Sequence, residues 1–207
     1  MAFSQIQIDN WNQQLKEATP EEIVSFAVQQ AKSPLVTTNF RPYEVNILHA
    51  VTQVSAGIKV IWCDTGYNTP QTYKHAEDLI ESLALNVKLY VPKQTSAHRD
   101  AVMGIPQIDD PLHKTFTEQV KLEPFKRAMV EHQPDVWFTN LRKGQTALRD
   151  SLDIFSLGSD GVLKVSPFYH WSDAQLDAYL AEHELPNEHK YFDPTKVLAN
   201  RECGLHT

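Results

Sequence analysis

The sequence predicts an α/β fold with an open, mostly parallel sheet and helices on both faces. Between residues 34 and 91, short apolar runs alternate with segments of helical periodicity. Strands separated by helices in this way pair in parallel through crossover connections. Two of the predicted helices also share a start signal, a threonine cap followed by proline, at Thr19-Pro20 and Thr69-Pro70.

The predicted elements follow one another closely along the chain. Helical periodicity predicts helices at residues 10–18, 20–31, 45–52, 70–83, 122–131 and 172–183. Apolar runs predict strands at 34–38, 59–63, 87–91, 136–138 and 162–165. Residues 96–112 give a weak signal broken by prolines and are expected to form loops. We therefore expect one α/β domain at 1–184 and a mobile C-terminal tail at 185–207.

Composition excludes several classes of protein. No apolar run approaches the roughly 18 residues of a membrane span, and no signal peptide opens the chain, so we expect a cytoplasmic enzyme without membrane contact. The net charge of −7 argues against nucleic-acid binding. Two cysteines exclude a disulfide framework and any site with four thiolate ligands, and the nine histidines show no metal-ligand spacing, so no metal is expected.

Polar turns follow the first two predicted strands. The first turn contains Thr37, Thr38, Asn39 and Phe40, and the second contains Asp64, Thr65, Gly66 and Tyr67. Ligands of open α/β sheets bind beyond the carboxyl ends of the strands, so both turns are candidate nucleotide contacts. Ordinary turn chemistry is an equally good explanation for the second turn taken alone.

A basic segment follows the fourth predicted strand. It contains Arg142, Lys143 and Arg149, with Gln145 between them. Cations placed after a strand end suit the recognition of phosphate or sulfate. In an acidic protein such a patch favours a small polyanion over nucleic acid. A solvated run of charges remains the alternative.

The sequence also offers a candidate nucleophile, Cys203. Only the thiolate is a useful nucleophile, and a nearby cation is needed to populate it at neutral pH. His206 lies three residues away and is the candidate assisting group. An incidental cysteine in a frayed segment is the alternative reading. The other cysteine, Cys63, is predicted to pack as a small hydrophobe at a buried strand end.

Four motifs occur in a fixed order: DTGY with PQTY at 64–73, KLEP with RA at 121–128, LRK with Gln145 and Arg149, and ECGLH at 202–206. They resemble the LDTGY…PETY, KVEP…RAL, LRREQSGSR and ECGLH segments of phosphoadenylyl-sulfate reductases, thioredoxin-dependent enzymes of sulfate assimilation. Four motifs in order are a more specific signal than any one of them.

The resemblance implies a fold of the adenine-nucleotide alpha-hydrolase (PP-loop) type and a covalent mechanism. In this family the cysteine, here Cys203, attacks the sulfur of 3′-phosphoadenylyl sulfate and becomes S-sulfocysteine. Adenosine 3′,5′-bisphosphate leaves, and thioredoxin or glutaredoxin then releases sulfite. Arg142, Lys143 and Arg149 match the motif expected to stabilise the negative charge. Further cations for a 3′-phosphate are Arg41, Lys121, Lys126 and Arg127.

The resemblance also sets expectations for cofactors and partners. We expect no bound cofactor, a sulfonucleotide substrate and thioredoxin as partner, and we leave a homodimer open. The related adenylyl-sulfate reductases add four cysteines for an iron–sulfur cluster, which this chain cannot supply.

Two departures from the family pattern are evident. Arg41 replaces a glycine of the family loop SSSFG-x-Q-S, which reduces close backbone approach to an anion, and Glu44 nearby adds an opposing charge. The segment 186–201 is shorter than its family counterpart, which has a GDTHTT-like stretch. Two alternatives therefore stay open: a catalytically impaired sulfonucleotide- or nucleotide-binding module, and a cluster-free adenylyl-sulfate reductase.

Overall fold

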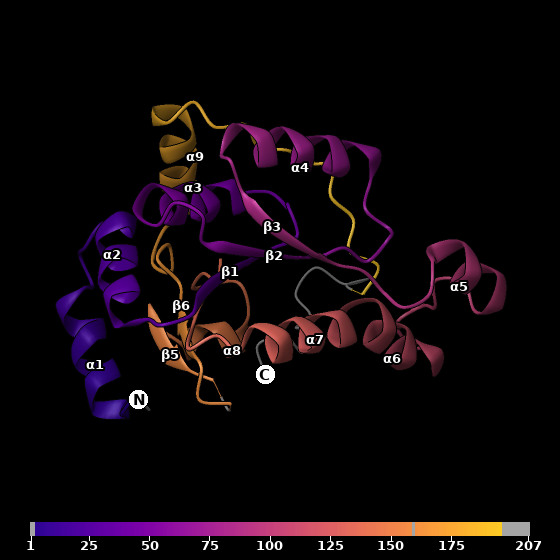
Figure 1. Cartoon of the computed structure of the whole chain (residues 1–207), viewed down its shortest axis with the longest axis horizontal. Coiled ribbons are helices and arrows are strands. Elements are labelled where there is room, and N and C mark those ends of the chain that lie inside the picture. Colours follow the sequence, from indigo (N-terminus) through magenta and orange to yellow (C-terminus); the bar gives the residue numbers. More distant parts are fainter. Residues whose placement is uncertain (1–2, 159, 196–207) are drawn as a thin grey trace.

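The computed structural model describes residues 3–158 and 160–195. Its centre is a six-stranded sheet with the strand order β3-β2-β1-β4-β6-β5 (Figure 1). The strands are β1 (Pro34–Thr38), β2 (Lys59–Cys63), β3 (Asn86–Tyr90), β4 (Val136–Phe138), β5 (Phe155–Leu157) and β6 (Leu163–Val165). β5 pairs antiparallel with β6, and the other neighbouring strands pair in parallel. The mostly parallel sheet predicted from the sequence is confirmed.

Helices cover both faces of this sheet. Figure 1 shows α3 and α4 on one side and α7 on the other. The helices are α1 (Gln5–Gln14), α2 (Pro20–Gln30), α3 (Glu44–Val54), α4 (Pro70–Ser82), α5 (Ser96–Val102), α6 (Leu112–Thr117), α7 (Glu123–His132), α8 (Ala147–Asp150) and α9 (Asp173–Glu182). A π-helical turn, η1 (Glu118–Leu122), joins α6 to α7.

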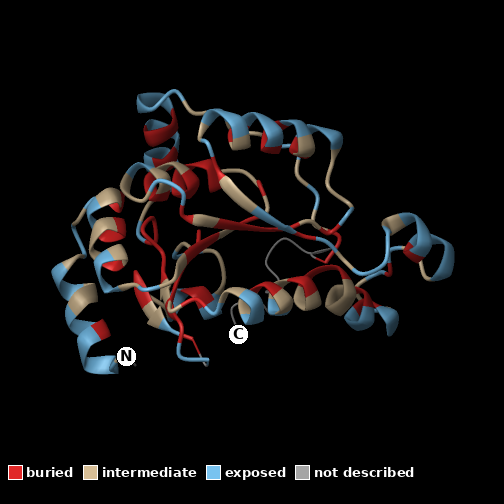
Figure 2. Cartoon of the chain, in the orientation of Figure 1, coloured by how far each residue is buried: buried red, intermediate tan, exposed pale blue. Residues whose placement is uncertain are grey.

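The central strands send alternate side chains into two cores. On β2, Val60 and Trp62 belong to the larger core, which includes side chains of α3 and α4, whereas Ile61 and Cys63 belong to a smaller core that includes Ala128 of α7. The central strands are accordingly buried along most of their length (Figure 2). A parallel strand covered on both faces reads as a continuous apolar run, which is why this segment was recognisable in the sequence.

The strand order creates a natural position for a ligand. The chain builds β1, β2 and β3 outward in one direction and then returns to the other side of β1 with β4. The connections after β1 and β4 therefore leave the sheet in opposite directions. Open α/β sheets bind their ligands in the crevice at such a switch point.

Besides α6, η1 and α8, which were not predicted, local structure differs from the expectation in three places. The first helix begins at Gln5 rather than at residue 10, because Ser4 and Gln7 form a capping box. The segment 96–112 contains α5, whose cap is Thr95, and not loops alone. β5 was missed because Phe155-Ser156-Leu157 is a short run interrupted by a serine, unlike the continuous apolar run of β4, which has the same length. Over residues 3–158 and 160–195, no helix combines the length and apolar character of a membrane span.

Candidate nucleotide-binding site

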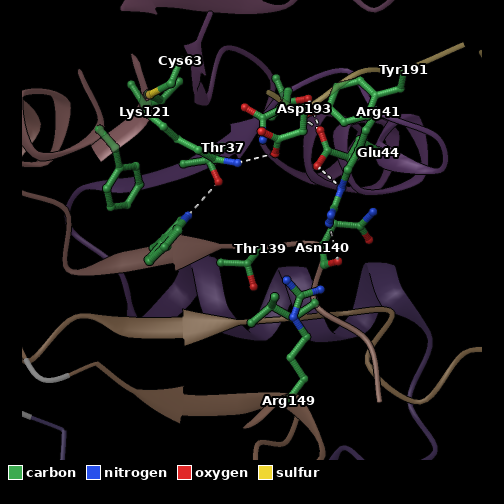
Figure 3. A pocket seen from close by; sticks show the side chains of 16 residues that line it. Thr37, Arg41, Glu44, Cys63, Lys121, Thr139, Asn140, Arg149, Tyr191 and Asp193 are labelled. Carbon is green, nitrogen blue, oxygen red and sulfur yellow. Dashed lines mark hydrogen bonds and ion pairs between the residues drawn. The ribbon is translucent and has the colours of Figure 1, made fainter. Parts of the chain in front are cut away.

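A cavity of about 70 Å³ lies at the carboxyl ends of β1 and β4 (Figure 3). Its wall includes Thr37, Thr38 and Asn39 from the end of β1 and the turn after it, and Thr139, Asn140 and Leu141 from the chain after β4. Charged side chains also line it: Arg41, Glu44, Lys121, Arg149 and Asp193. The cavity therefore occupies the switch point of the sheet, where the strand order favours a ligand.

The cavity is closed on one side by residues 190–193. The carbonyl oxygen of Lys190 accepts hydrogen bonds from the hydroxyls of Thr69 at 2.6 Å and Thr72 at 3.2 Å. Pockets for drug-sized ligands commonly enclose roughly 300 to 1,000 Å³, several times the volume found here. Residues 190–193 belong to no helix or strand.

A buried ion pair attaches this segment to η1. Lys121 Nζ lies 2.5 Å from Asp193 Oδ2, and the two side chains are 4% and 8% exposed. Burial alone raises the pKa of Asp193, but the charge of Lys121 and hydrogen bonds from Lys121 and Thr195 outweigh it and lower the pKa. Asp193 therefore stays ionised, and an anionic ligand that contacts Lys121 must compete with this carboxylate.

The basic segment after β4 directs Arg149 to the cavity. Arg149 is buried, and Gln145 Oε1 accepts a hydrogen bond from its Nη1. The backbone N–H of Arg149 donates to Thr146 Oγ1, the cap of α8. A guanidinium fork fixed in this way suits a phosphate or sulfonate group.

The other two predicted cations lie outside the cavity wall. Arg142 forms an ion pair with Asp173 at the start of α9, and its guanidinium carbon lies 5.5 Å from the centre of the Tyr43 ring. Lys143 is exposed. The sequence spacing could not show which of the three cations lines the cavity, because that depends on how the segment after β4 folds.

Two further cations that were candidates for a 3′-phosphate are paired on the surface of α7. Lys126 lies 2.9 Å from Glu118, and Arg127 lies 3.0 Å from Glu123. Neither lines the cavity.

The turn after β2 is held together by its own contacts. Asp64 Oδ1 accepts hydrogen bonds from the Gly66 N–H, the Asn68 amide and the Tyr73 hydroxyl at 2.9 to 3.0 Å. Burial and the charge of Asp64 raise the pKa of Tyr73 to about 12, so the phenol remains a donor. Tyr67 donates to Asp100 of α5 instead of pointing to the cavity. Turn chemistry accounts for the Gly66 and Asn68 contacts, and a role of this turn in nucleotide binding stays a prediction.

Of three other predicted site residues, two are packed in the protein interior and one lines the cavity. Thr65 is buried and does not line the cavity. Phe40 is buried, with its ring centre 4.9 Å from that of Trp62. Thr37 does reach the cavity wall, where its hydroxyl accepts a hydrogen bond from Trp137 Nε1 at 3.0 Å.

Cys63 lies in the cavity wall but is not a reactive thiol. Burial raises its pKa to about 12, so the thiol is neutral at physiological pH. The prediction that Cys63 packs as a small hydrophobe is confirmed, because it belongs to the smaller core. Cys203 and His206 lie outside the described residues. Within the described ranges, no group of three or more His, Cys, Asp or Glu side chains could hold a metal ion.

Sequence reasoning missed part of the wall. Thr139, Asn140, Tyr191 and Asp193 were not singled out. A signal existed for the first two, because polar residues that follow β4 must lie beside the end of its parallel neighbour β1. No comparable signal marked Tyr191 or Asp193, which reach the cavity from a segment without regular structure.

Comparison with known proteins finds relatives over most of the chain. Residues 34–193 match the profile of the phosphoadenosine phosphosulfate reductase domain. A phosphoadenosine 5′-phosphosulfate reductase from Xylella fastidiosa (strain M12) is 34% identical over 182 residues, which cover 86% of this chain and 76% of that protein.

Solved structures agree with this comparison. The phosphoadenylyl-sulfate reductase of Candida auris, in its phosphate complex, superposes with a TM-score of 0.78 at 27% identity and 90% coverage of each chain. The FMN adenylyltransferase of Candida glabrata with FAD and inorganic pyrophosphate gives a TM-score of 0.55 at 10% identity, covering 87% of this chain and 60% of that one. The second likeness shows the fold alone, which is of the nucleotide alpha-hydrolase type.

Proposed function

We propose that this chain, which belongs to the phosphoadenosine phosphosulfate reductase family, reduces 3′-phosphoadenylyl sulfate through a covalent intermediate on Cys203. The observation that carries the proposal is the cavity at the switch point, whose wall contains the buried Arg149 and Lys121, the latter paired with Asp193. The ECGLH motif at 202–206 supplies the thiol that the chemistry needs. The cavity and its cations favour a nucleotide that carries several anionic groups.

The proposed reaction divides one difficult displacement into two steps. The thiolate of Cys203 attacks the sulfur of the sulfonate, the bond between sulfur and the bridging oxygen breaks, and adenosine 3′,5′-bisphosphate leaves with the electron pair. A thiol of reduced thioredoxin then attacks the Cys203 sulfur and displaces sulfite. The second thioredoxin thiol reduces the mixed disulfide, which returns Cys203 to its thiol form and leaves thioredoxin oxidised.

The described residues contribute mainly electrostatics to this reaction. Negative charge is present on the leaving phosphate and on the sulfonate throughout the first step. Fixed cations act strongly in a buried site, because few water molecules screen them. We assign this role to Arg149 and Lys121, and the role of populating the thiolate of Cys203 to His206. We also propose that the protein acts in sulfate assimilation in the cytoplasm, with thioredoxin or glutaredoxin as the electron donor.

Adenosine 3′,5′-bisphosphate is expected to bind at least about tenfold more tightly than adenosine 5′-phosphate, or about 1.4 kcal/mol. A 3′-phosphate adds close to two negative charges and needs cations of its own. Calorimetric titration of both nucleotides at one salt concentration measures the difference. Equal affinities would point to a cluster-free adenylyl-sulfate reductase or a binding module, and sulfite release from each sulfonucleotide would separate these two.

A further inference from the structure

The loop between β1 and α3 surrounds an anion, the carboxylate of Glu44, which is the first residue of α3. Glu44 Oε2 accepts hydrogen bonds from the Asn39 N–H at 2.6 Å and from the Thr38 hydroxyl at 2.8 Å. Glu44 Oε1 accepts one from Arg41 Nε at 2.8 Å. Glu44 is only 4% exposed, although it is charged and lies in the wall of the nucleotide cavity.

The groups that surround this carboxylate are those that proteins use to bind phosphate. A backbone N–H beyond a strand end, a hydroxyl and a guanidinium converge beside the N-terminus of α3, where the helix dipole favours negative charge. Phe40 and Tyr43 have positive φ angles of 52° and 65°, which turn the backbone sharply around the carboxylate. The loop therefore has the geometry of an anion-binding site, and the anion that it binds is the Glu44 carboxylate.

The two unusual residues of this loop are partners of each other. Arg41 stands where the family loop SSSFG-x-Q-S has a glycine, and Glu44 is the first residue of α3. In the structure they form an ion pair at 2.8 Å. The charges of Arg41 and Glu44 cancel, so the pair adds no net charge to the loop. The donors that could bind an anion are hydrogen-bonded to the Glu44 carboxylate instead.

We propose that Glu44 is a specificity-determining residue, which keeps anionic groups of the substrate out of the β1–α3 loop. Because a like charge within a few ångströms strongly disfavours a second anion, the phosphates and sulfonate are directed to the buried Arg149 elsewhere in the cavity wall. The inference rests on the proposed function, since it assumes that the sulfonucleotide binds in this cavity.

The decisive variant removes the ion pair without changing net charge. Arg41→Gly/Glu44→Ser frees the Asn39 N–H and the Thr38 hydroxyl. Its affinity for inorganic phosphate, measured by calorimetric titration of the full chain, is expected to rise at least about tenfold. Lys126→Gly/Glu118→Ser is the matched control, because it removes an exposed pair 2.9 Å apart that does not line the cavity. The control is expected to bind phosphate like the wild type.

A second variant keeps the inference testable if the double variant does not fold. Glu44→Gln keeps the shape of the side chain but removes its charge, and its phosphate affinity is also expected to rise. If folded Glu44 variants, checked by circular dichroism, bind phosphate no better than the wild type, Glu44 is only a structural residue of α3 and the inference is wrong.

A different measurement tests the proposed function itself. It would be contradicted if the wild-type chain bound no adenosine 3′,5′-bisphosphate. The phosphate titrations of the Glu44 variants would still report on the loop in that case, so the two failures are distinguishable.

Discussion

Cys203→Ser is expected to abolish sulfite release from 3′-phosphoadenylyl sulfate and to leave the affinity for adenosine 3′,5′-bisphosphate within about tenfold of the wild type. A serine hydroxyl at this position does not ionise at neutral pH and cannot carry a sulfonate to thioredoxin. The cations of the cavity are unchanged by the substitution, so the nucleotide keeps its contacts. Sulfite release with reduced thioredoxin and calorimetric titration of the nucleotide measure the two effects.

Cys63→Ser is the matched control for this prediction. Its thiol has a pKa of about 12 because it is buried, and it is therefore not a nucleophile at neutral pH. The variant is expected to keep most of the wild-type activity. A loss as deep as that of Cys203→Ser would indicate a mechanism with two thiols, and activity in Cys203→Ser would remove Cys203 from the mechanism.

Arg149→Met is expected to weaken the binding of adenosine 3′,5′-bisphosphate by about 1.5 to 3 kcal/mol, the usual contribution of a charge-assisted hydrogen bond. The side chain is buried in the cavity wall, so moderate salt should reduce this loss only slightly. Calorimetric titration at two salt concentrations measures it, and thermal unfolding shows whether the variant is folded.

Arg142→Met controls for the removal of a positive charge from the same segment. The two arginines are equivalent candidates in the sequence, but Arg142 pairs with Asp173 and does not line the cavity. We expect its effect on nucleotide affinity to be several times smaller, and to fade with salt. Equal losses in both variants would contradict the assignment of Arg149 as the cation that contacts the ligand.

The central fold was predictable because its signals are local. β1 and β2 are continuous apolar runs, and α2 and α4 begin with a threonine cap and proline, which the structure confirms. β5, α5, α6 and α8 were missed because none of them has a long periodic pattern. β5 has three residues and obtains its place from pairing with β6.

The site was only partly predictable, because long-range packing completes it. The end of β1 and Arg149 were identified from polar residues after strands, and both line the cavity. Lys121 and Asp193 form an ion pair although they are 72 positions apart, and no sequence spacing predicts this contact. Glu44 was expected to oppose an anion, but the sequence did not show that Thr38 and Asn39 donate to its carboxylate.

The central claim, a covalent sulfonate on Cys203, is tested most directly by mass spectrometry. The full chain is incubated with 3′-phosphoadenylyl sulfate in the absence of thioredoxin and other reductants, and its peptides are then analysed. We expect the mass of one sulfonate group on the peptide that contains Cys203, and its loss when reduced thioredoxin is added. An unmodified Cys203 in a sample that nevertheless releases adenosine 3′,5′-bisphosphate would contradict the proposed mechanism.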